Sequence, residues 1–427
     1  MKVYFHTLGC KVNRYETEYM LKQLQNRGFT QTEKAVDADL IVVNSCTVTA
    51  ESDRKTRQLV RRYRRTNSNA IILLTGCMPQ AFPSEASELP ADIIIGNKSE
   101  RDIVKSVEEF LKNHNRIIEV EPHKKGESFE KGGLDTFSER TRAYIKIEDG
   151  CDRGCTYCII PKARGRVRSR SLLEIENEAE RLAQNGFKEL VLVGINLSSF
   201  GKDTGYSLAD AVSAASKSNG IKRVRLGSLE PDLTDDALLK ELSKNAKFCP
   251  QFHLSLQSGC DETLKRMNRL YTSGFYKELV QKIRSIWKNA SVTTDIMVGF
   301  IGESDEEFEK SLKFAKDIEF LKAHIFPYSV RKGTAAANMK GRVAEDIKSK
   351  RAGVIAKECD AVTDKILNSL IGDTRTVLFE RSENEYTEGY SEDYIRVFVP
   401  KDDLLCGKLA EVKIVKIMQD GVLAKVI

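Results

Sequence analysis

A chain of 427 residues exceeds what one hydrophobic core usually organises, so we expect two or three domains. Its hydrophobic content of 41% and its modest net charge of +6 suit a soluble globular protein. The amino-terminal residues carry no secretory signal, and no stretch approaches the roughly 18 apolar residues of a membrane-spanning helix. These features argue against a secreted or membrane-spanning protein, and we expect a cytoplasmic one.

Residues 1–115 alternate short β-branched runs with helical segments, which predicts a doubly wound parallel sheet. The first helix is expected to end at Gly28. The predicted strands lie at 2–9, 39–45, 70–76 and 92–97.

Three of these strands are each followed by a cysteine, namely Cys10, Cys46 and Cys77. The carboxyl ends of parallel strands meet at one edge of a sheet, where ligands bind. Three buried apolar cysteines are the alternative, but we favour a site made of three thiolates.

Residues 116–137 are polar and lack periodicity, which predicts a linker. From residue 138 to 366 strands and helices alternate again, and Ser171 with Glu174 and Ser304 with Glu307 are possible capping boxes. Six such units predict a partial (βα)6 barrel. The expected strands lie at 143–148, 189–194, 222–228, 251–257, 293–300 and 323–329.

The last part of the chain follows a helical stretch at about 344–368. Residues 367–427 contain short alternating strands with tight turns, which predict a small antiparallel β-barrel. Small barrels often bind RNA, and a purely structural cap is an open alternative.

A second set of cysteines lies in the segment GCDRGCTYC, where Cys151, Cys155 and Cys158 are spaced by four and three residues. Structural zinc sites and four-iron clusters normally take four protein ligands. Three thiolates therefore leave one position open, as in a catalytic metal site, where a small molecule could bind. None of the five histidines is spaced from another as a metal ligand, and His253, inside a strand, is expected to be a packed core residue.

Two runs of the chain are densely basic, RRYRR at 61–65 and KARGRVRSR at 162–170. For the first run, a solvated helix face and a nucleic-acid contact are equally good readings. The second run directly follows the cysteine cluster, so we predict that Arg164, Arg166 and Arg168 bind RNA.

The motif C-x3-C-x2-C with an aromatic residue before the last cysteine resembles that of radical S-adenosylmethionine (SAM) enzymes. The resemblance extends over the whole chain to the methylthiotransferase family, and most closely to its branch that acts on threonylcarbamoyladenosine of tRNA. It is carried by LGCKVNRYETE, NSCTVT, TGC, CIIPKARG, GINLSSFG, RLGSLEP, HLSLQSGCDETLKRMNR, TTDIMVGFIGE and FPYSVRKGT.

This resemblance implies two 4Fe-4S clusters, one on Cys151, Cys155 and Cys158 and one on the first three cysteines. It implies insertion of a methylthio group at adenine C2, next to the anticodon, with two SAM molecules. It also implies a terminal RNA-binding barrel of the TRAM type, tRNA as a partner and flavodoxin or ferredoxin as a low-potential electron donor. We expect a monomer, and no side chain is assigned a catalytic role. By their positions after strands, the residues expected to contact SAM are Tyr157, Asn196, Glu230, Ser255, Gln257, Gly299 and Gly302.

The threonylcarbamoyl group carries a carboxylate, so its pocket should offer a cation, for which Arg331 and Lys332 are candidates. Two alternatives stay open within the family: isopentenyladenosine of tRNA and an aspartate of a ribosomal protein. An alternative of another class is a non-catalytic iron-sulfur protein that binds RNA and senses redox state.

Overall fold

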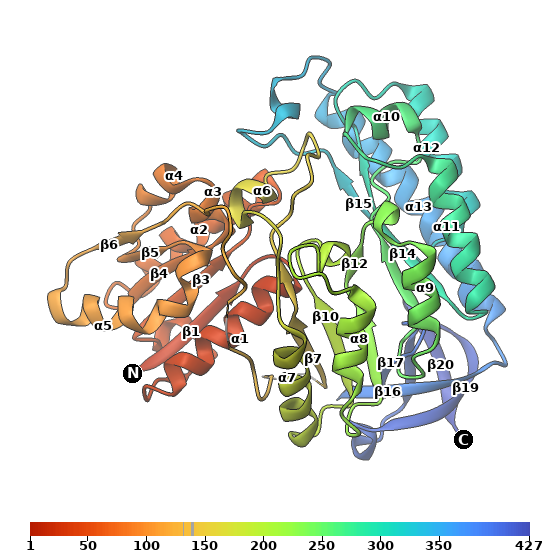
Figure 1. Ribbon diagram of the computed structural model, residues 1–427, viewed down its shortest axis with the longest axis horizontal. Coiled ribbons are helices and arrows are strands. Elements are labelled where there is room, and N and C mark those ends of the chain that lie inside the picture. The colour runs from red at the N-terminus through yellow and green to blue at the C-terminus, as the bar shows by residue number, and fades with distance from the viewer. Residues whose placement is uncertain (131, 138–140) are drawn as a thin grey trace. The chain divides into compact units, whose positions relative to one another are not determined.

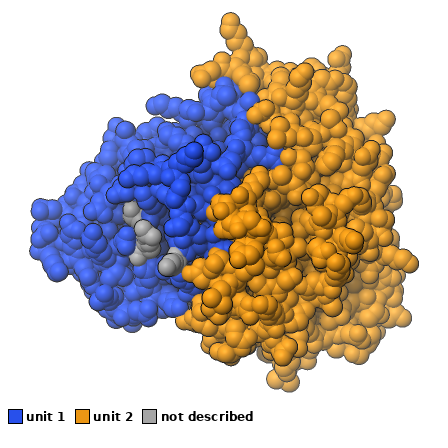
Figure 2. Space-filling view, viewed as in Figure 1, with its two compact units in different colours: residues 1–134, 148–170, 329–337 blue, residues 135–147, 171–328, 338–427 orange. Residues whose placement is uncertain are grey.

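The structure is a computed structural model that describes residues 1–130, 132–137 and 141–427. It forms two compact units, which Figure 2 colours separately. Unit 1 comprises residues 1–134, 148–170 and 329–337, and unit 2 comprises residues 135–147, 171–328 and 338–427. The start of the second predicted domain at Ser138 lies outside the described residues, as does Lys131 of the predicted linker.

Unit 1 is built on a six-stranded parallel sheet with the strand order β2-β1-β3-β4-β5-β6. The predicted segments all form strands, and β2 and β6 are additional. Because β6 lies within residues 116–137, the segment predicted as a linker begins with a strand of the sheet. The strands are β1 Lys2–Thr7, β2 Thr30–Gln31, β3 Leu40–Ser45, β4 Ile71–Gly76, β5 Ile93–Ile95 and β6 Ile117–Glu119.

Helices cover both faces of this sheet, as Figure 1 shows. Successive strand residues point to opposite faces, so Val42 packs with α1 and α5 on one face, whereas Ile41 packs with α2, α3 and α4 on the other. This confirms the doubly wound arrangement. The helices are α1 Lys11–Gln25, α2 Ala50–Thr66, α3 Cys77–Ala81, α4 Pro83–Ser87 and α5 Ile103–Asn113, with 3₁₀ turns η1 Ala35–Asp37 and η2 Asn97–Asp102.

A second part of unit 1 is the loop that carries Cys151, Cys155 and Cys158. The short strands β8 Glu148–Asp149 and β9 Arg168–Ser169 pair in antiparallel fashion and close this loop. Within it lies the short helix α6, Ile160–Arg164.

Unit 2 contains two parallel sheets, ordered β11-β10-β7 and β12-β13-β14-β15. All six predicted strand segments are present, and Gly227 separates β11 from β12 within one of them. The strands are β7 Arg142–Lys146, β10 Glu189–Val193, β11 Arg223–Leu226, β12 Ser228–Leu229, β13 Gln251–Leu254, β14 Ser291–Val298 and β15 Lys322–Pro327.

The helices of unit 2 follow these strands. Ser304 and Glu307 form a complete capping box, as expected. Ser171 accepts the backbone N–H of Glu174, but the Glu174 carboxylate accepts from the Ser171 hydroxyl rather than from its backbone. The helices are α7 Leu172–Gln184, α8 Leu208–Ser216, α9 Asp236–Ser243, α10 Asp261–Arg266, α11 Ser273–Ile286, α12 Asp305–Ile318 and α13 Glu345–Ser369, with 3₁₀ turns η3 Leu197–Ser199, η4 Pro231–Leu233 and η6 Asp403–Leu405. The turn η5 Ala335–Asn338 begins in the last segment of unit 1.

The final strands of unit 2 form a closed five-stranded barrel with the order β16-β17-β18-β20-β19. The prediction of a purely antiparallel barrel is wrong at one pair, because β18 and β20 run parallel. The alternating runs at 374–380, 394–400, 408–418 and 422–427 predict four of these strands, whereas β17 was not expected from the sequence. The strands are β16 Thr374–Glu383, β17 Tyr386–Ser391, β18 Arg396–Pro400, β19 Leu409–Met418 and β20 Gly421–Val426.

Two arginines of β11 attach the barrel to the three-stranded sheet β11-β10-β7, which is called the central sheet below. Arg223 donates to the carbonyls of Thr376 and Tyr390 at 2.6 and 3.1 Å. Arg225 donates to the carbonyl of Ser391 at 3.1 Å and to the buried Glu189 carboxylate at 3.0 Å. Arg223 and Glu189 are the first residues of β11 and β10, so these contacts lie toward the amino ends of the two strands. No helix in the described part of the chain is both long and apolar enough to cross a membrane.

Candidate functional site

Cys10, Cys46 and Cys77 lie at the carboxyl edge of the sheet in unit 1, as predicted. Cys10 follows β1 and occupies the position before α1, Cys46 directly follows β3, and Cys77 directly follows β4 and begins α3. Cys46 and Cys77 are 7% and 2% exposed, whereas Cys10 is exposed. One free cysteine thiol therefore follows each of three neighbouring strands at the carboxyl edge of the sheet.

These three thiols influence one another electrostatically. Burial raises the pKa of the Cys77 thiol; the charge of Arg164 lowers it, and Cys46 and Cys10 raise it further. Metal ligation requires thiolates, so such a site needs positive charge to stabilise them. Three converging thiols beside a cationic group fit an iron-sulfur cluster.

Arg164 lies at the centre of this site and is 0% exposed. Its Nε donates to Cys77 Sγ at 3.2 Å. One terminal nitrogen donates to Glu16 at 2.8 Å and lies 3.4 Å from Asn13 Oδ1. The other also pairs with Glu16 and lies 3.5 Å from the Asp149 carboxylate. The guanidinium thus links the sulfur of one cysteine set to β8, which precedes the other set.

The structure therefore corrects two of the three predicted RNA contacts. Arg164 is enclosed in the network above, and Arg168 is 5% exposed and donates to the carbonyls of Arg164 and Arg166 at 2.9 Å. Neither guanidinium is placed to meet a phosphate. Arg166 remains exposed, at 68% of its side chain, and is 3.7 Å from Asp152.

The second cysteine set lies in the loop closed by β8 and β9. Cys151 N–H donates to the carbonyl of Gly165 at 3.0 Å, and Cys158 N–H donates to that of Cys155 at 3.1 Å. Gly150 has a φ of +88°, and a Cβ there would lie 2.0 Å from the Arg166 carbonyl oxygen, so the close turn before Cys151 requires glycine. All three thiols are partly exposed, which suits a site that exchanges a small molecule.

The two cysteine sets belong to the same compact unit. Helix α6 begins two residues after Cys158 and packs against α3, which begins with Cys77. Ile159 and Ala163 share a small hydrophobic core with Cys77, Ala81 and Phe82. Apolar packing and the Arg164 network therefore fix the loop of one set against the sheet that carries the other.

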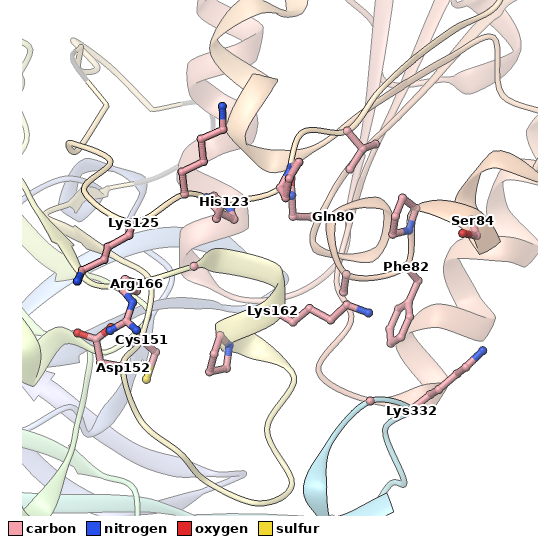
Figure 3. Close-up of a pocket in the computed structure, with 18 of the residues that line it drawn as sticks. Gln80, Phe82, Ser84, His123, Lys125, Cys151, Asp152, Lys162, Arg166 and Lys332 are labelled. Carbon is pink, nitrogen blue, oxygen red and sulfur yellow. The ribbon is translucent and has the colours of Figure 1, made fainter.

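A cavity of about 970 Å³ in unit 1 opens beside Cys151. Figure 3 shows Lys162 extending toward the Phe82 ring, and its Nζ lies 4.9 Å from the ring centroid. The lining of the cavity is mainly cationic. Among the residues that line it, Glu85 and Asp152 are the only two with negative side chains. The positive residues are Lys124, Lys125, Arg153, Lys162, Arg166 and Lys332.

The predicted SAM contacts Asn196, Glu230, Ser255 and Gln257 all follow strands of unit 2 at their carboxyl ends. Glu230 is engaged in an ion pair with Arg269 at 2.5 Å. Gln257 has a φ of +67° and its backbone pairs with Asp295 and Met297 of β14. Tyr157 lies in unit 1, in the cysteine loop, and is partly exposed.

The two predicted glycine contacts have another physical explanation. A Cβ at Gly299, whose φ is +67°, would lie 2.1 Å from the Lys348 side chain, so the group that approaches this glycine is Lys348. Gly302 has a φ of +72° and a backbone N–H bonded to the Gly341 carbonyl at 2.7 Å. Chain geometry therefore accounts for both glycines without a cofactor.

The predicted cation for a substrate carboxylate is corrected at Arg331. This residue is 4% exposed and pairs with Asp53 at 2.5 Å and with the Thr47 hydroxyl at 2.8 Å, all within unit 1. The Asp53 carboxylate already compensates the charge of Arg331. Lys332 is 85% exposed and lines the cavity beside Cys151.

Sequence reasoning missed several residues of these sites. Asn13, Glu16 and Asp149 surround Arg164, and only their closeness to cysteines in the chain could have signalled this. His253 is not a packed core residue but is partly exposed on β13, close to Asp295. Of the cysteines outside the two sets, Cys249, Cys260 and Cys359 are buried and Cys406 is partly exposed.

Two protein families match the chain. The family described as "Uncharacterized protein family UPF0004" matches residues 2–96. The family described as "Radical SAM superfamily" matches residues 145–315. The matched regions contain the two cysteine sets, one in each.

Similar curated proteins cover nearly the whole chain. "Threonylcarbamoyladenosine tRNA methylthiotransferase MtaB" of Thermotoga maritima is 39% identical over 425 residues, covering 99% of this chain and 96% of that protein. "tRNA-2-methylthio-N(6)-dimethylallyladenosine synthase" of Pelotomaculum thermopropionicum is 34% identical over 418 residues, covering 95% and 93%. Among solved structures, the radical S-adenosylmethionine methyltransferase TsrM of Kitasatospora setae has a TM-score of 0.55 at 14% identity, covering 76% of this chain and 74% of that one. This last likeness concerns the fold alone.

Proposed function

Because this chain belongs to the radical SAM methylthiotransferase family, we propose that it inserts a methylthio group at adenine C2 of N6-threonylcarbamoyladenosine in tRNA, next to the anticodon. The observation that carries this proposal is the presence of two three-cysteine sets in one compact unit, joined by Arg164. The Thermotoga maritima relative, at 39% identity, is named for threonylcarbamoyladenosine, and the Pelotomaculum thermopropionicum relative, at 34%, is named for dimethylallyladenosine, which favours the first substrate.

In this proposal, the chain holds two 4Fe-4S clusters. Cys151, Cys155 and Cys158 hold one of them, with the fourth ligand position left for SAM, and the carboxyl-edge cysteines of the sheet hold the other. When bound, the first cluster supplies the electron that cleaves SAM, and the second supplies the sulfur that is transferred.

The chain's own residues position these groups. Arg164 stabilises the Cys77 thiolate by a charged hydrogen bond and keeps the helix after Cys158 in place. Asn196, Glu230, Ser255 and Gln257 lie at the strand ends where SAM is proposed to bind. Glu230 is proposed to act on the SAM site indirectly, because its carboxylate forms an ion pair with Arg269 and orients that side chain.

We divide the chain into a methylthiotransferase domain at 1–115, a linker at 116–137 whose first residues add β6 to the sheet of that domain, a radical SAM domain at 138–366 and a TRAM-like RNA-binding barrel at 367–427. In the radical SAM domain the strands of the two parallel sheets are proposed to form a partial (βα)6 barrel. Flavodoxin or ferredoxin is the proposed electron donor, and the protein is proposed to act as a monomer in the cytoplasm.

The cationic cavity beside Cys151 is the proposed approach for the tRNA backbone. Replacing Arg166 or Lys162 with glutamate should weaken tRNA binding, because each of these side chains lines the cavity and carries a positive charge toward it. A plot of log affinity against log salt concentration has a negative slope, and each lost phosphate contact should make it less steep by about 0.7 to 0.9. Filter binding at several salt concentrations measures both quantities.

The matched control is Arg61→Glu, which reverses an exposed charge in the other basic run, on α2 of the same unit. Equal weakening by Arg61→Glu would place the main RNA contact on α2 instead of the cavity. If the salt dependence of tRNA affinity is unchanged in Arg166→Glu, the Arg166 side chain does not contact a phosphate.

Mass spectrometry of tRNA nucleosides from a strain lacking the gene tests the proposed substrate. The methylthio derivative of threonylcarbamoyladenosine should disappear, and its precursor should accumulate. Restoring the gene should reverse both changes, whereas a Cys155→Ala copy should not. Loss of the methylthio derivative of isopentenyladenosine would identify the other tRNA substrate, and unchanged nucleosides would contradict a role in tRNA.

A further inference from the structure

Three side chains with metal-binding atoms gather in unit 2, outside the cysteine sites. They are His253 of β13, Asp295 of β14 and His324 of β15, and one ligand atom of each lies within 4.8 Å of the others. His253 Nε2 lies 3.3 Å from Asp295 Oδ2, and the two imidazole rings are 6.0 Å apart between centroids. Nothing in the proposed methylthiotransferase chemistry uses this cluster.

The strand register explains why the three residues meet. In the parallel pairing, His253 is opposite Thr293 and Asp295 is opposite His324. Thr293 and Asp295 are two residues apart on β14, so their side chains share one face of the sheet. The three ligands therefore come from neighbouring strands of a rigid element, which holds them at fixed separations.

A hydrogen bond orients the ring of His253. Its Nδ1 lies 3.0 Å from the Thr293 hydroxyl oxygen, which also accepts from Gln251 Nε2 at 3.2 Å. An Nδ1–H that donates to this oxygen leaves the Nε2 lone pair facing the Asp295 carboxylate. In this tautomer two electron-rich atoms face each other and a cation between them is favourable, and hydrogen bonding of the distal ring nitrogen is how histidine ligands of metals are usually oriented.

The separation of these two atoms leaves room for a metal ion between them. A charged N–H···O bond between imidazolium and carboxylate spans about 2.7 to 2.9 Å. Two ligands on a tetrahedral ion with bonds of about 2.0 to 2.2 Å are separated by about 3.3 to 3.6 Å. The observed 3.3 Å falls at the lower end of the second range and just beyond the upper end, about 3.2 Å, of an ordinary N–H···O hydrogen bond, so the zinc titration decides between them.

Solvent access and ligand type indicate which ion fits. His253 and Asp295 keep 16% and 30% of their side chains exposed, and His324 is exposed, so an ion can enter. Two imidazoles and one carboxylate suit Zn²⁺, whereas Mg²⁺ and Ca²⁺ prefer oxygen ligands. We propose that His253, Asp295 and His324 bind a divalent cation of the zinc type, with a fourth position left for water or a ligand.

Zinc binding by the iron-loaded protein tests this site. Protein reconstituted with iron and sulfide keeps its cluster cysteines occupied, so added Zn²⁺ is directed away from them. After desalting, elemental analysis should find about one zinc per chain, and titration should show at least about a hundredfold weaker binding in His324→Ala and Asp295→Asn. Iron content should not change. Because His324 is exposed, its removal should not disturb folding.

The matched control is His114→Asn, which removes a histidine that follows α5 in a left-handed conformation that asparagine tolerates. This variant should bind zinc as the wild type does. Co²⁺ in place of zinc should give weak visible bands from nitrogen and oxygen ligation, without intense sulfur charge-transfer absorption. No zinc in the wild type, equal zinc in His324→Ala, or sulfur charge transfer with Co²⁺ would each overturn the proposal. These outcomes do not depend on tRNA or SAM, so they leave the proposed function untouched.

Discussion

Replacing Cys155 with alanine should abolish the reductive cleavage of SAM, whereas replacing Cys46 should leave that cleavage intact. Cys155 belongs to the partly exposed set in the loop, and Cys46 belongs to the set at the sheet edge. If each set holds a separate cluster, either variant should lose about half of the iron, from about eight to about four atoms per chain. Only Cys46→Ala should still form 5′-deoxyadenosine with dithionite and SAM, and neither should methylthiolate tRNA.

The control for this comparison is Cys406→Ala, which removes a partly exposed thiol of the barrel and should change neither iron nor product. Wild-type protein that holds only about four irons after anaerobic reconstitution would contradict the two-cluster proposal. Absence of 5′-deoxyadenosine in the wild type would favour a non-catalytic, redox-sensing protein instead.

Replacing Arg164 with leucine should destabilise unit 1 by about 3 to 5 kcal/mol, because removing one partner of a buried ion pair leaves uncompensated charge. The Glu16 and Asp149 carboxylates are both buried around this guanidinium. The variant should also retain less iron, since Cys77 loses its charged hydrogen bond. Hydrogen exchange of peptides from α1 and α3 in the cluster-free protein measures the loss within unit 1, whereas fluorescence of Trp287 would report unit 2.

The matched variant is Arg166→Leu, two residues along the chain and largely exposed, which should change stability by no more than about 0.5 kcal/mol. The double variant Arg164→Leu with Glu16→Leu should recover part of the lost stability, because it removes both the positive and the negative partner of the buried ion pair. Equal exchange rates in Arg164→Leu and the wild type would show that the buried pair contributes little.

The positions of the cysteines could be predicted from the sequence because local patterns determine them. Apolar runs such as those ending at Ser45 and Gly76 identify buried parallel strands, and the residue after such a strand must lie at the carboxyl edge. The loop around Cys155 could be placed by the same reasoning. Each of these inferences needs only neighbours in the chain.

The surroundings of the basic run could not be predicted, because burial depends on distant partners. Charge density suggested an RNA surface for Arg164, but Glu16 lies 148 residues away and provides a buried carboxylate for it. Similarly, 42 residues separate His253 from Asp295 in the chain, and only the strand register brings them together. The parallel pair in the barrel also depends on how the sheet closes, which no local pattern encodes.

The attachment of the barrel through Arg223 and Arg225 turns the central sheet into a spacer of fixed length. Arg223 begins β11, and Arg225 reaches Glu189 at the beginning of β10, whereas four residues proposed to hold SAM, Asn196, Glu230, Ser255 and Gln257, follow the carboxyl ends of the strands. The five residues of β10 span about 17 Å at about 3.3 Å per residue. Within unit 2 the length of these strands therefore separates the attachment of the barrel from the strand ends at which SAM is proposed to bind.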